Sequence, residues 1–386
     1  MALGNNNSMA QIKGKNKAVM VKRRKEVVAA VNFKAFPASP PQSGPNAWGY
    51  SGALSKTLYH NGTGLLPLVN DIVYELKVYK LPLGNPQAKG RPIVNLLPLS
   101  EGEQVTTMMP LPKNDENPPD LMFATKSGNV RRNALSDFSN VKANGKIAMK
   151  LVDGDSLVGV VPCKKNDDIM LSASLGKCMR FRSGDVRLFK GRGSIGVRGI
   201  RLKKDDEVIS ISVLKHIEAD TEVKSLYLKA ATAKRRGDNQ DFIDDNIFES
   251  MYSDDQFILT ISENGYGKRS SAYEYRITNR GGQGIINIET SERNGNVIAS
   301  FPVLDTDDVM MVTNKGRIIR SPVNDIRIAS RNTQGVTLFS IDDGEKVVSV
   351  TTISLDENED NDEVIIDDDN IENVNNVNED ENKNDW

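Results

Sequence analysis

The chain has 386 residues, of which 38% are hydrophobic and 26% charged, a composition typical of a soluble globular protein. It contains no apolar run long enough to cross a membrane and no basic-then-apolar leader, so the sequence argues against membrane insertion and secretion and predicts a cytoplasmic location. The two cysteines, Cys163 and Cys178, lack CxxC spacing, and His60 and His216 are the only histidines. A zinc site or a histidine-based catalytic triad is therefore not expected.

Opposite charges are separated along the chain, although the formal net charge is only −2. Residues 355–386 hold fourteen Asp or Glu and one Lys, whereas the preceding 354 residues hold 49 basic and 38 acidic side chains. A second acidic segment, residues 216–255, holds ten acidic and five basic side chains. The rest of the body is therefore strongly basic, and such an excess of positive charge attracts a polyanion.

Residues 1–70 show little periodicity and contain NNNS and SPPQSGPNAWGYSG, a composition typical of a linker or a disordered segment. From Asp71 to about Ser354, two kinds of segment alternate instead. The first is a short strand, a turn with glycine and a basic strand, which the turn chemistry identifies as a β-hairpin. It occurs at Met122–Arg132, Met170–Arg182, Ile258–Ser270 and Met310–Ser321.

The second kind of segment contains a glycine followed by alternating apolar residues. It occurs at Lys89–Leu99, Asn144–Asp155, Gly196–Glu207, Gln283–Gly295 and Gln334–Glu345. A turn then leads into a β-branched strand such as Glu207–Val213 or Lys346–Thr352. Each unit of about 50 residues thus has about four strands, which predicts an all-β, propeller-like architecture with five visible blades over residues 71–354.

The acidic segment 216–255 lengthens one interval between repeats and is interpreted as an insertion between blades. Lys224–Arg236 (KSLYLKAATAKRR) has a helix-forming composition, so one helix is expected there, although a disordered loop fits the composition equally well. Residues 355–386 have the composition of a disordered acidic tail.

Basic side chains recur on the second strand of each hairpin and in the loop after it. Because equivalent positions of successive blades face the same way, we expect them to form a belt on the outer surface that follows a phosphate backbone without reading bases. Solvated surface charge explains any single one of them, but their recurrence in four units favours the functional interpretation. The predicted belt consists of Arg91, Arg131, Arg132, Lys177, Arg180, Arg182, Arg187, Lys190, Arg192, Arg198, Arg201, Lys268, Arg269, Arg276, Arg280, Lys315, Arg317, Arg320, Arg327 and Arg331.

The sequence predicts no catalytic or metal-binding residues. It lacks the motifs GxxxxGK[ST], GxSxG and HExxH. The glycine-rich GRGSIG at Gly191–Gly196 lies between expected strands, with no helix after it, and is interpreted as a turn.

Several of the repeated segments resemble the C-terminal domain of bacterial DNA gyrase A subunits. They are GRPIVNLLPL (Gly90–Leu99), NGKIAMKLVDGDSLVGV (Asn144–Val160), GVRGIRL (Gly196–Leu202), NGYGKR (Asn264–Arg269) and RNTQGV (Arg331–Val336). The resemblance covers about 71–354 and implies a six-bladed β-pinwheel that wraps double-stranded DNA around its basic rim. It also implies a role in ATP-dependent negative supercoiling by a type II topoisomerase, in the bacterial cytoplasm and associated with the nucleoid.

The resemblance further implies that the catalytic parts lie elsewhere. DNA is cleaved by the N-terminal part of the A subunit and ATP is hydrolysed by the B subunit, in a holoenzyme of two A and two B subunits. ATP and Mg²⁺ belong to that holoenzyme, and no cofactor is expected in this chain. Since no tyrosine here stands in the RYT context of the family's nucleophile, we expect DNA binding and bending by the chain alone, without cleavage or ATP hydrolysis.

The family's QRRGGKG box, its hallmark for wrapping, is absent. Where it should lie the chain reads KRRKEVVAAVN (Lys22–Asn32). Our hypothesis is that residues 1–70 are partly an out-of-frame translation of the box and the first blade, which the nucleotide sequence would decide. Such a chain has a damaged first blade and is expected to bind DNA but to wrap it poorly.

Two alternatives stay open at this point. One is a propeller scaffold for protein partners, which the salt dependence of binding would distinguish from a phosphate-binding rim. The other is the topoisomerase IV A subunit, whose domain usually has fewer blades and lacks the segments quoted above. In the preferred interpretation the acidic tail, tethered at high effective concentration, competes with DNA for the basic rim.

Overall fold

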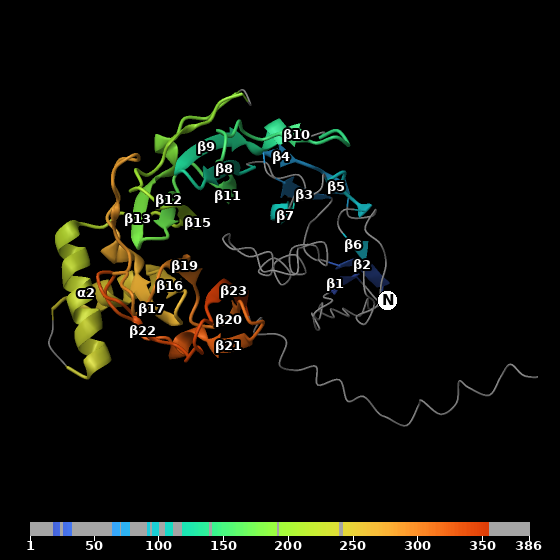
Figure 1. The fold of residues 1–386 in the computed structure, drawn as a ribbon. Coiled ribbons are helices and arrows are strands. Elements are labelled where there is room, and N and C mark those ends of the chain that lie inside the picture. The colour runs from blue at the N-terminus through green and yellow to red at the C-terminus, as the bar shows by residue number, and fades with distance from the viewer. Residues whose placement is uncertain are drawn as a thin grey trace, which may run out of the picture. The chain divides into compact units, whose positions relative to one another are not determined.

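The structure of the chain is a computed structural model (Figure 1). It describes residues 18–23, 26–32, 64–69, 71–77, 91–92, 95–99, 105–110, 118–138, 141–190, 193–238 and 242–354. The expectations for the acidic tail lie outside these residues. Those for segment 1–70, including the frame-shift hypothesis, fall mostly outside them, since the described parts of this segment are strands β1 (Ala18–Arg23), β2 (Glu26–Asn32) and β3 (Gly64–Val69).

Three successive sheets share one antiparallel plan of four strands, and each is named here by its second strand. The β8 sheet has the order β11-β8-β9-β14, the β12 sheet the order β15-β12-β13-β18, and the β16 sheet the order β19-β16-β17-β22. Their bounds are β8 Asp120–Thr125, β9 Asn129–Ala134, β11 Leu157–Cys163, β12 Asp168–Ala173, β13 Lys177–Arg182, β14 Val197–Arg198, β15 Val208–Leu214, β16 Phe257–Ser262, β17 Tyr266–Ser271, β18 Ile285–Ile286, β19 Val297–Val303 and β22 Val336–Thr337. The predicted all-β class with four-stranded units is confirmed.

The last strand of each of these sheets comes from the following repeat. β14 comes after the β12–β13 hairpin in the chain but pairs with β9, and β18 and β22 pair with β13 and β17 in the same way. Parallel backbone bridges between Arg132 and Leu188 and between Arg180 and Ile277 lie close to two of these contacts. Neighbouring repeats are therefore joined by backbone hydrogen bonds, an exchange of strands that the sequence pattern did not reveal.

Sheets at the two ends of the described chain differ from this plan. The β3 sheet has the order β10-β4-β3-β5, with β7 also paired to β3, and β1, β2 and β6 form a further sheet. The β20 sheet has three strands, in the order β21-β20-β23. Within the described ranges, no strand pairs with β21 at the position that β14, β18 and β22 occupy elsewhere. The bounds are β4 Ile72–Val73, β5 Leu76–Lys77, β6 Arg91–Pro92, β7 Val105–Pro110, β10 Lys146–Ile147, β20 Asp307–Thr313, β21 Ile318–Pro322 and β23 Val347–Ser354.

The predicted hairpins are the pairs β8–β9, β12–β13, β16–β17 and β20–β21. Each turns at a glycine with positive φ, and these hairpin glycines are Gly128, Gly176, Gly265 and Gly316. A Cβ at Gly176 would also lie 2.2 Å from the carbonyl oxygen of Ile288, so this turn excludes larger residues for two reasons. A 3-10 helix follows each hairpin: η3 (Leu135–Phe138), η4 (Ser183–Asp185), η5 (Ala272–Glu274) and η6 (Val323–Asp325).

Apolar side chains fill the space between neighbouring sheets. All residues of β12 and β16 are buried. One hydrophobic cluster joins Met122 of the β8 sheet to Leu171 and Phe181 of the β12 sheet, and another joins Leu259 of the β16 sheet to Val309 of the β20 sheet. Each sheet is therefore covered by the next one, as expected for blades that stack on their neighbours.

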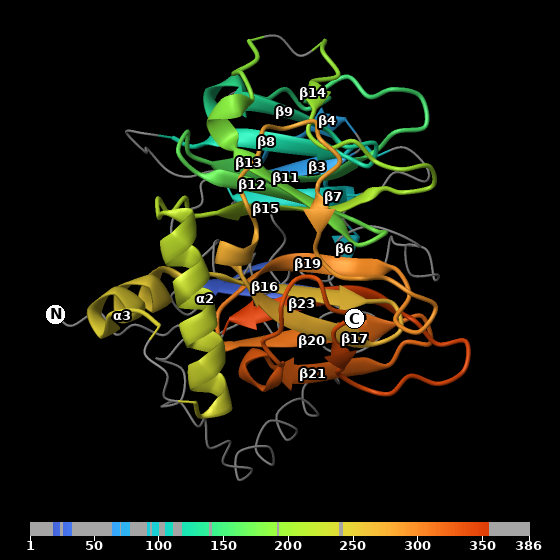
Figure 2. The same ribbon diagram turned by 90° about the vertical axis from the view of Figure 1, so that its left-hand side faces the viewer.

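The insertion forms two helices, α2 (Thr221–Arg236) and α3 (Asp245–Asp254), and Figure 2 shows both. Helix α2 begins three residues before the predicted helix, because the Asp220 side chain caps it by accepting from the Glu222 backbone N–H, and it ends at Gly237 with φ 76°. Helix α3 was missed. Its sequence, DNIFESMYSD, consists mostly of residues with low helix propensity, and the helix begins where the Asp244 side chain accepts from the Asn246 N–H.

Candidate nucleic-acid interface

An arginine stands four residues after each hairpin glycine, at Arg132, Arg180, Arg269 and Arg320. The sequence placed all four on the exposed belt. In the structure 54% of the Arg320 side chain is accessible, whereas the other three side chains are only 8%, 5% and 6% accessible. The same sequence position thus has two different environments.

Arg180 shows what the buried position does. Its Nε and Nη2 donate to Oδ2 of Asp168 over 3.0 and 2.8 Å, and Asp168 on the adjacent strand β12 is completely buried. Its Nη1 donates to the carbonyl oxygen of Ala272, 2.7 Å away in η5 of the next repeat. A buried carboxylate therefore neutralises this guanidinium while it joins two repeats.

Arg269 makes the same connection with other partners. Phe257 replaces the aspartate of β12, and the guanidinium carbon lies 5.8 Å from its ring centroid, while Asp305 supplies the carboxylate. Nε and Nη2 of Arg269 donate to the carbonyl oxygens of Ile326 and Asn324, over 2.7 and 3.0 Å, in the next repeat. This second guanidinium therefore also stabilises the contact between neighbouring sheets.

Two further belt residues, Arg131 and Lys268, are completely buried. Nη1 of Arg131 donates to the carbonyl oxygen of Ser194 over 2.8 Å, and Nζ of Lys268 donates to that of Ser330 over 2.6 Å. Burial lowers the pKa of Arg131, and it lowers the pKa of Lys268 to about 7. Both side chains satisfy carbonyl groups of the next repeat.

The expected exposed position is therefore wrong for five belt residues: Arg131, Arg132, Arg180, Lys268 and Arg269. Arg132 pairs with Asp120 of the adjacent strand over 3.8 Å. The physical reason is that loops of the following repeat cover the second strands β9, β13 and β17 and present carbonyl oxygens, which need donors in a buried contact. Arg131, Arg180, Lys268 and Arg269 connect neighbouring repeats, and all five side chains are buried away from phosphate.

The other described belt residues lie at the surface. The exposed ones are Arg182, Arg187, Lys190, Arg198, Arg201, Arg276, Lys315, Arg317, Arg320 and Arg327, and the half-buried ones are Lys177, Arg280 and Arg331. Some already have acidic partners: Arg182 pairs with Glu218, Arg317 with Glu345 and Arg320 with Asp308. The belt residues Arg91 and Arg192 lie outside the residues whose side chains are described.

Six surface cations of the belt make no side-chain hydrogen bond or ion pair with any described residue. They are Lys177, Lys190, Arg198, Arg201, Arg276 and Arg327. Because no carboxylate of the described residues pairs with them, they are the belt residues best able to attract the phosphates of a polyanion. We call them the free cations of the belt.

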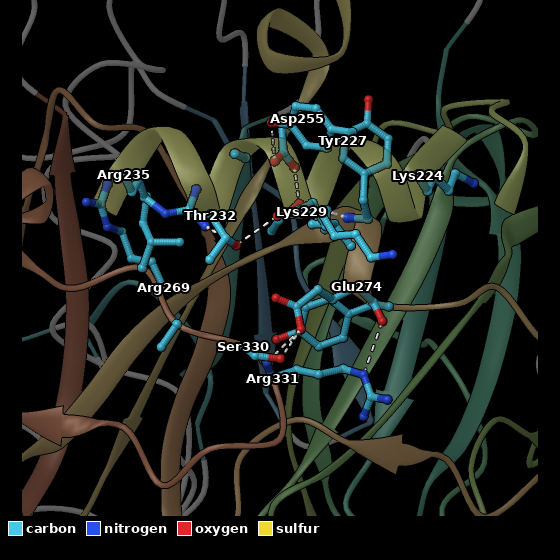
Figure 3. Close-up of a pocket in the computed structure, with 18 of the residues that line it drawn as sticks. Lys224, Tyr227, Lys229, Thr232, Arg235, Asp255, Arg269, Glu274, Ser330 and Arg331 are labelled. Carbon is cyan, nitrogen blue, oxygen red and sulfur yellow. Dashed lines mark hydrogen bonds between the residues drawn. The ribbon is translucent and has the colours of Figure 1, made fainter. Parts of the chain in front are cut away.

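A groove of about 1410 Å³ lies between α2 and the loops that follow η5 and η6 (Figure 3). It brings the belt residues Arg276, Arg327 and Arg331 together with basic side chains of α2, which are Lys224, Lys229, Arg235 and Arg236. The sequence analysis missed the helix residues because segment 216–255 is acidic as a whole. Their spacing was the available signal, since Lys224 and Arg235 lie three helical turns apart and so share one face.

Other functional chemistry finds little support in the described part of the chain. There, no group of three His, Cys, Asp or Glu side chains could hold a metal ion, and no helix is both long and apolar enough to cross a bilayer. Cys163 and Cys178 are buried and unpaired, and burial raises the pKa of each thiol to about 12. Neither cysteine is set up as a nucleophile.

Comparison with curated proteins finds DNA gyrase A subunits. The A subunit of Rickettsia bellii is 48% identical over 306 residues, which cover 75% of this chain and 34% of that protein. The A subunit of Escherichia coli is 37% identical over 282 residues, which cover 73% of this chain and 28% of that protein. The chain thus spans about a third of the length of the curated relatives it matches.

Two solved structures share the fold. The DNA gyrase A C-terminal domain has a TM-score of 0.56 at 20% identity, with 85% of this chain and 86% of that chain covered. The C-terminal domain of DNA topoisomerase IV has a TM-score of 0.61 at 17% identity, with 87% and 91% covered. At these identities the likeness shows the fold alone.

The family model named "DNA gyrase C-terminal domain, beta-propeller" matches five segments, residues 72–112, 119–164, 167–215, 256–303 and 307–354. They correspond to the five repeats, and residues 216–255, which contain α2 and α3, fall between two of them. The chain therefore belongs to the family of DNA gyrase A C-terminal domains, with the β-pinwheel fold.

Proposed function

We propose that this chain binds double-stranded DNA through the free cations of its belt and bends the duplex across successive repeats. The observation that carries the proposal is that these cations recur on consecutive repeats without a side-chain partner among the described residues, in a chain of the gyrase A C-terminal family. Contacts from Arg and Lys to phosphates fix the position of a duplex and do not depend on its sequence. The interaction should therefore be strong at low salt and insensitive to base sequence.

In this proposal the chain acts as a non-catalytic part of DNA gyrase. By bending DNA it would present a nearby duplex for strand passage and so support ATP-dependent negative supercoiling in the bacterial cytoplasm. Its partners would be the cleavage domain of the A subunit and the B subunit, and the ATP and Mg²⁺ of the reaction would be bound by those parts. The fold does not distinguish gyrase from topoisomerase IV, since solved domains of both enzymes share it. The sequence identity of 37% and 48% to gyrase A subunits is what supports the gyrase context.

The proposed interface is tested by comparing two variants that lose the same charge. Lys190→Gln/Arg198→Gln/Arg201→Gln removes free cations of the belt. Its control, Lys126→Gln/Lys215→Gln/Lys346→Gln, removes lysines whose ammonium groups already pair with Glu207, Asp254 and Glu263. DNA affinity is measured by fluorescence anisotropy over a series of salt concentrations, with circular dichroism to verify folding.

We expect the belt variant to reduce the slope of log affinity against log salt by about 3, since each phosphate contact contributes roughly 0.9. The control should keep a slope close to that of the wild-type chain. Equal slopes for all three proteins would contradict the proposed interface. Affinity that hardly changes with salt would favour a protein-binding scaffold instead.

Wrapping of DNA around the chain is tested in a separate assay. A nicked plasmid is ligated in the presence of increasing amounts of the chain, and the linking number of the products is measured. A shift that grows with the amount of chain indicates wrapping. Salt-sensitive binding without any shift would limit the function to DNA binding.

A further inference from the structure

The insertion separates its charges between two helices. Helix α2 carries the basic residues Lys224, Lys229, Lys234, Arg235 and Arg236 against the single acid Glu222, whereas α3 holds three acidic residues and no basic one. Lys234 is the one basic residue of α2 that pairs with α3, with Nζ 3.7 Å from Asp245 and 3.8 Å from Glu249. The net negative charge of residues 216–255 therefore conceals a basic helix.

Helix α2 is held firmly against the β16 sheet. The Tyr227 ring is buried between Phe248 of α3 and Tyr273 of η5, with centroid distances of 5.4 and 5.2 Å. Its hydroxyl donates to Oδ2 of Asp255 over 3.0 Å, and the hydroxyl of Ser271 in β17 donates to Oδ1 over 2.8 Å. These contacts fix which face of α2 borders the groove.

The groove between α2 and the blades is lined mainly by positive charge. Figure 3 shows Lys224, Lys229 and Arg235 along the helix. Nine basic side chains line the walls of the groove: the buried Arg180 and Arg269, and Lys224, Lys229, Arg235, Arg236, Arg276, Arg327 and Arg331. The acidic residues of the lining are Asp238, Asp255, Glu274 and Asp325. Two of these are already engaged, Asp255 as described above and Glu274 through the Ser330 hydroxyl and the Arg331 backbone N–H, over 2.6 and 2.9 Å.

Most of the basic groups in the groove lack a partner among the described residues. In the described part of the chain, Lys224, Lys229, Arg236, Arg276 and Arg327 make no side-chain hydrogen bond or ion pair. Burial, reinforced by the nearby Arg180, lowers the pKa of Lys224, and burial also lowers the pKa of Arg235. An anion in the groove would relieve the cost of keeping these groups charged.

We propose that the α2 groove is a second binding site for the DNA backbone, formed by the insertion together with the loops after η5 and η6. This inference rests on the proposed DNA binding and extends it to a helix that lies between the matched segments of the family. The groove is continuous with the belt, because Arg276 and Arg327 belong to both.

The length of the row of charge fits a duplex. Lys224 and Arg235 lie eleven residues apart on α2, which corresponds to roughly 17 Å along the helix axis. One strand of B-DNA carries a phosphate about every 3.4 Å of its axis, so the row can face several consecutive phosphates. The many charged side chains of the lining favour a polyanion over an apolar peptide.

The first test compares variants on the two sides of one helix in the full chain. Lys224→Gln/Lys229→Gln/Arg236→Gln removes partner-free cations of the groove, and Lys234→Gln removes the lysine that faces α3. We expect the triple variant to reduce the salt slope of DNA binding by about 3 and Lys234→Gln to leave it unchanged. A wild-type slope and affinity in the triple variant would overturn the inference.

A second test does not depend on the stability of the triple variant. Because Cys163 and Cys178 are buried with raised pKa values, a cysteine introduced at the surface can be labelled selectively. Lys224→Cys and Lys234→Cys are labelled with a photo-activated cross-linker and irradiated with duplex DNA. Cross-links from position 224 well in excess of those from position 234 are expected, and equal or absent cross-links from DNA-bound chain would overturn the groove site.

The two proposals fail in different ways. If the wild-type chain does not bind duplex DNA at low salt, the proposed function fails and the groove site fails with it. If the wild-type chain binds and the belt variant loses affinity while the groove variant does not, only the groove site is wrong.

Discussion

The buried arginine Arg180 allows the sharpest test of how the repeats hold together. In Arg180→Met the side chain keeps its approximate length but loses the pair with Asp168 and the hydrogen bond to the Ala272 carbonyl. Asp168 is completely buried, and among the described residues it would keep a side-chain hydrogen bond with the imidazole of His216, 3.0 Å from its Oδ1. Removing one member of a buried ion pair costs about 3–5 kcal/mol, so we expect a loss of that size in the free energy of unfolding.

The matched control is Arg320→Met, at the same position of the β20 sheet. Arg320 is largely exposed, although its partner Asp308 is buried, so water screens this pair more than the fully buried one and its loss should cost clearly less than that of Arg180. Both variants are unfolded with urea and followed by circular dichroism. Equal destabilisation of the two variants would refute the conclusion that the buried arginines join the repeats. A further variant, Arg180→Met/Asp168→Leu, should recover much of the loss, because no buried charge is left unpaired.

Three more predictions concern a buried amine, a turn and the tail. The pKa of Lys268 is about 7 in the folded chain, below its usual 10.5, so between these pH values the unfolded chain binds more protons than the folded chain. The free energy of unfolding should therefore rise from pH 7 to pH 9, by up to about 1.4 kcal/mol per pH unit. Urea titrations should show this rise for the wild-type chain and not for Lys268→Met. Gly176→Ala should lower the melting temperature far more than Gly154→Ala. Both glycines have φ 80°, but an added Cβ would clash with a neighbouring atom only at Gly176. Similar decreases in melting temperature for the two variants would contradict this reasoning. Removing residues 355–386 should tighten DNA binding at low salt, and an anisotropy titration that shows unchanged affinity would leave the tail a solvating segment.

Local chemistry made the hairpins and one helix predictable. A glycine between a β-rich segment and a basic strand marks a turn wherever it occurs, and the hairpins at Gly128, Gly176, Gly265 and Gly316 follow from residues only a few positions apart. The composition of Lys224–Arg236 likewise predicted most of α2. The five family segments agree with the spacing of these repeats.

The sequence pattern did not predict the contacts between repeats. The two-residue strands β14, β18 and β22 join the sheet of the preceding repeat, and a short alternating segment carries no signal of which neighbour it pairs with. The same contacts bury Arg180 and Arg269 while leaving Arg320 exposed, although the three arginines occupy equivalent positions in sequence.

The sequence by itself determined the all-β class, the period of the repeats and the excess of basic residues in the body. Each of these depends on composition or on neighbours within one hairpin. Only the tertiary structure decided which cations are free, because a charge is neutralised or exposed by groups far away in the chain. It also showed that a net acidic insertion presents a basic face to the groove. The angle of each residue around the helix decides which face carries its charge, and the net charge of the segment contains no information on these angles.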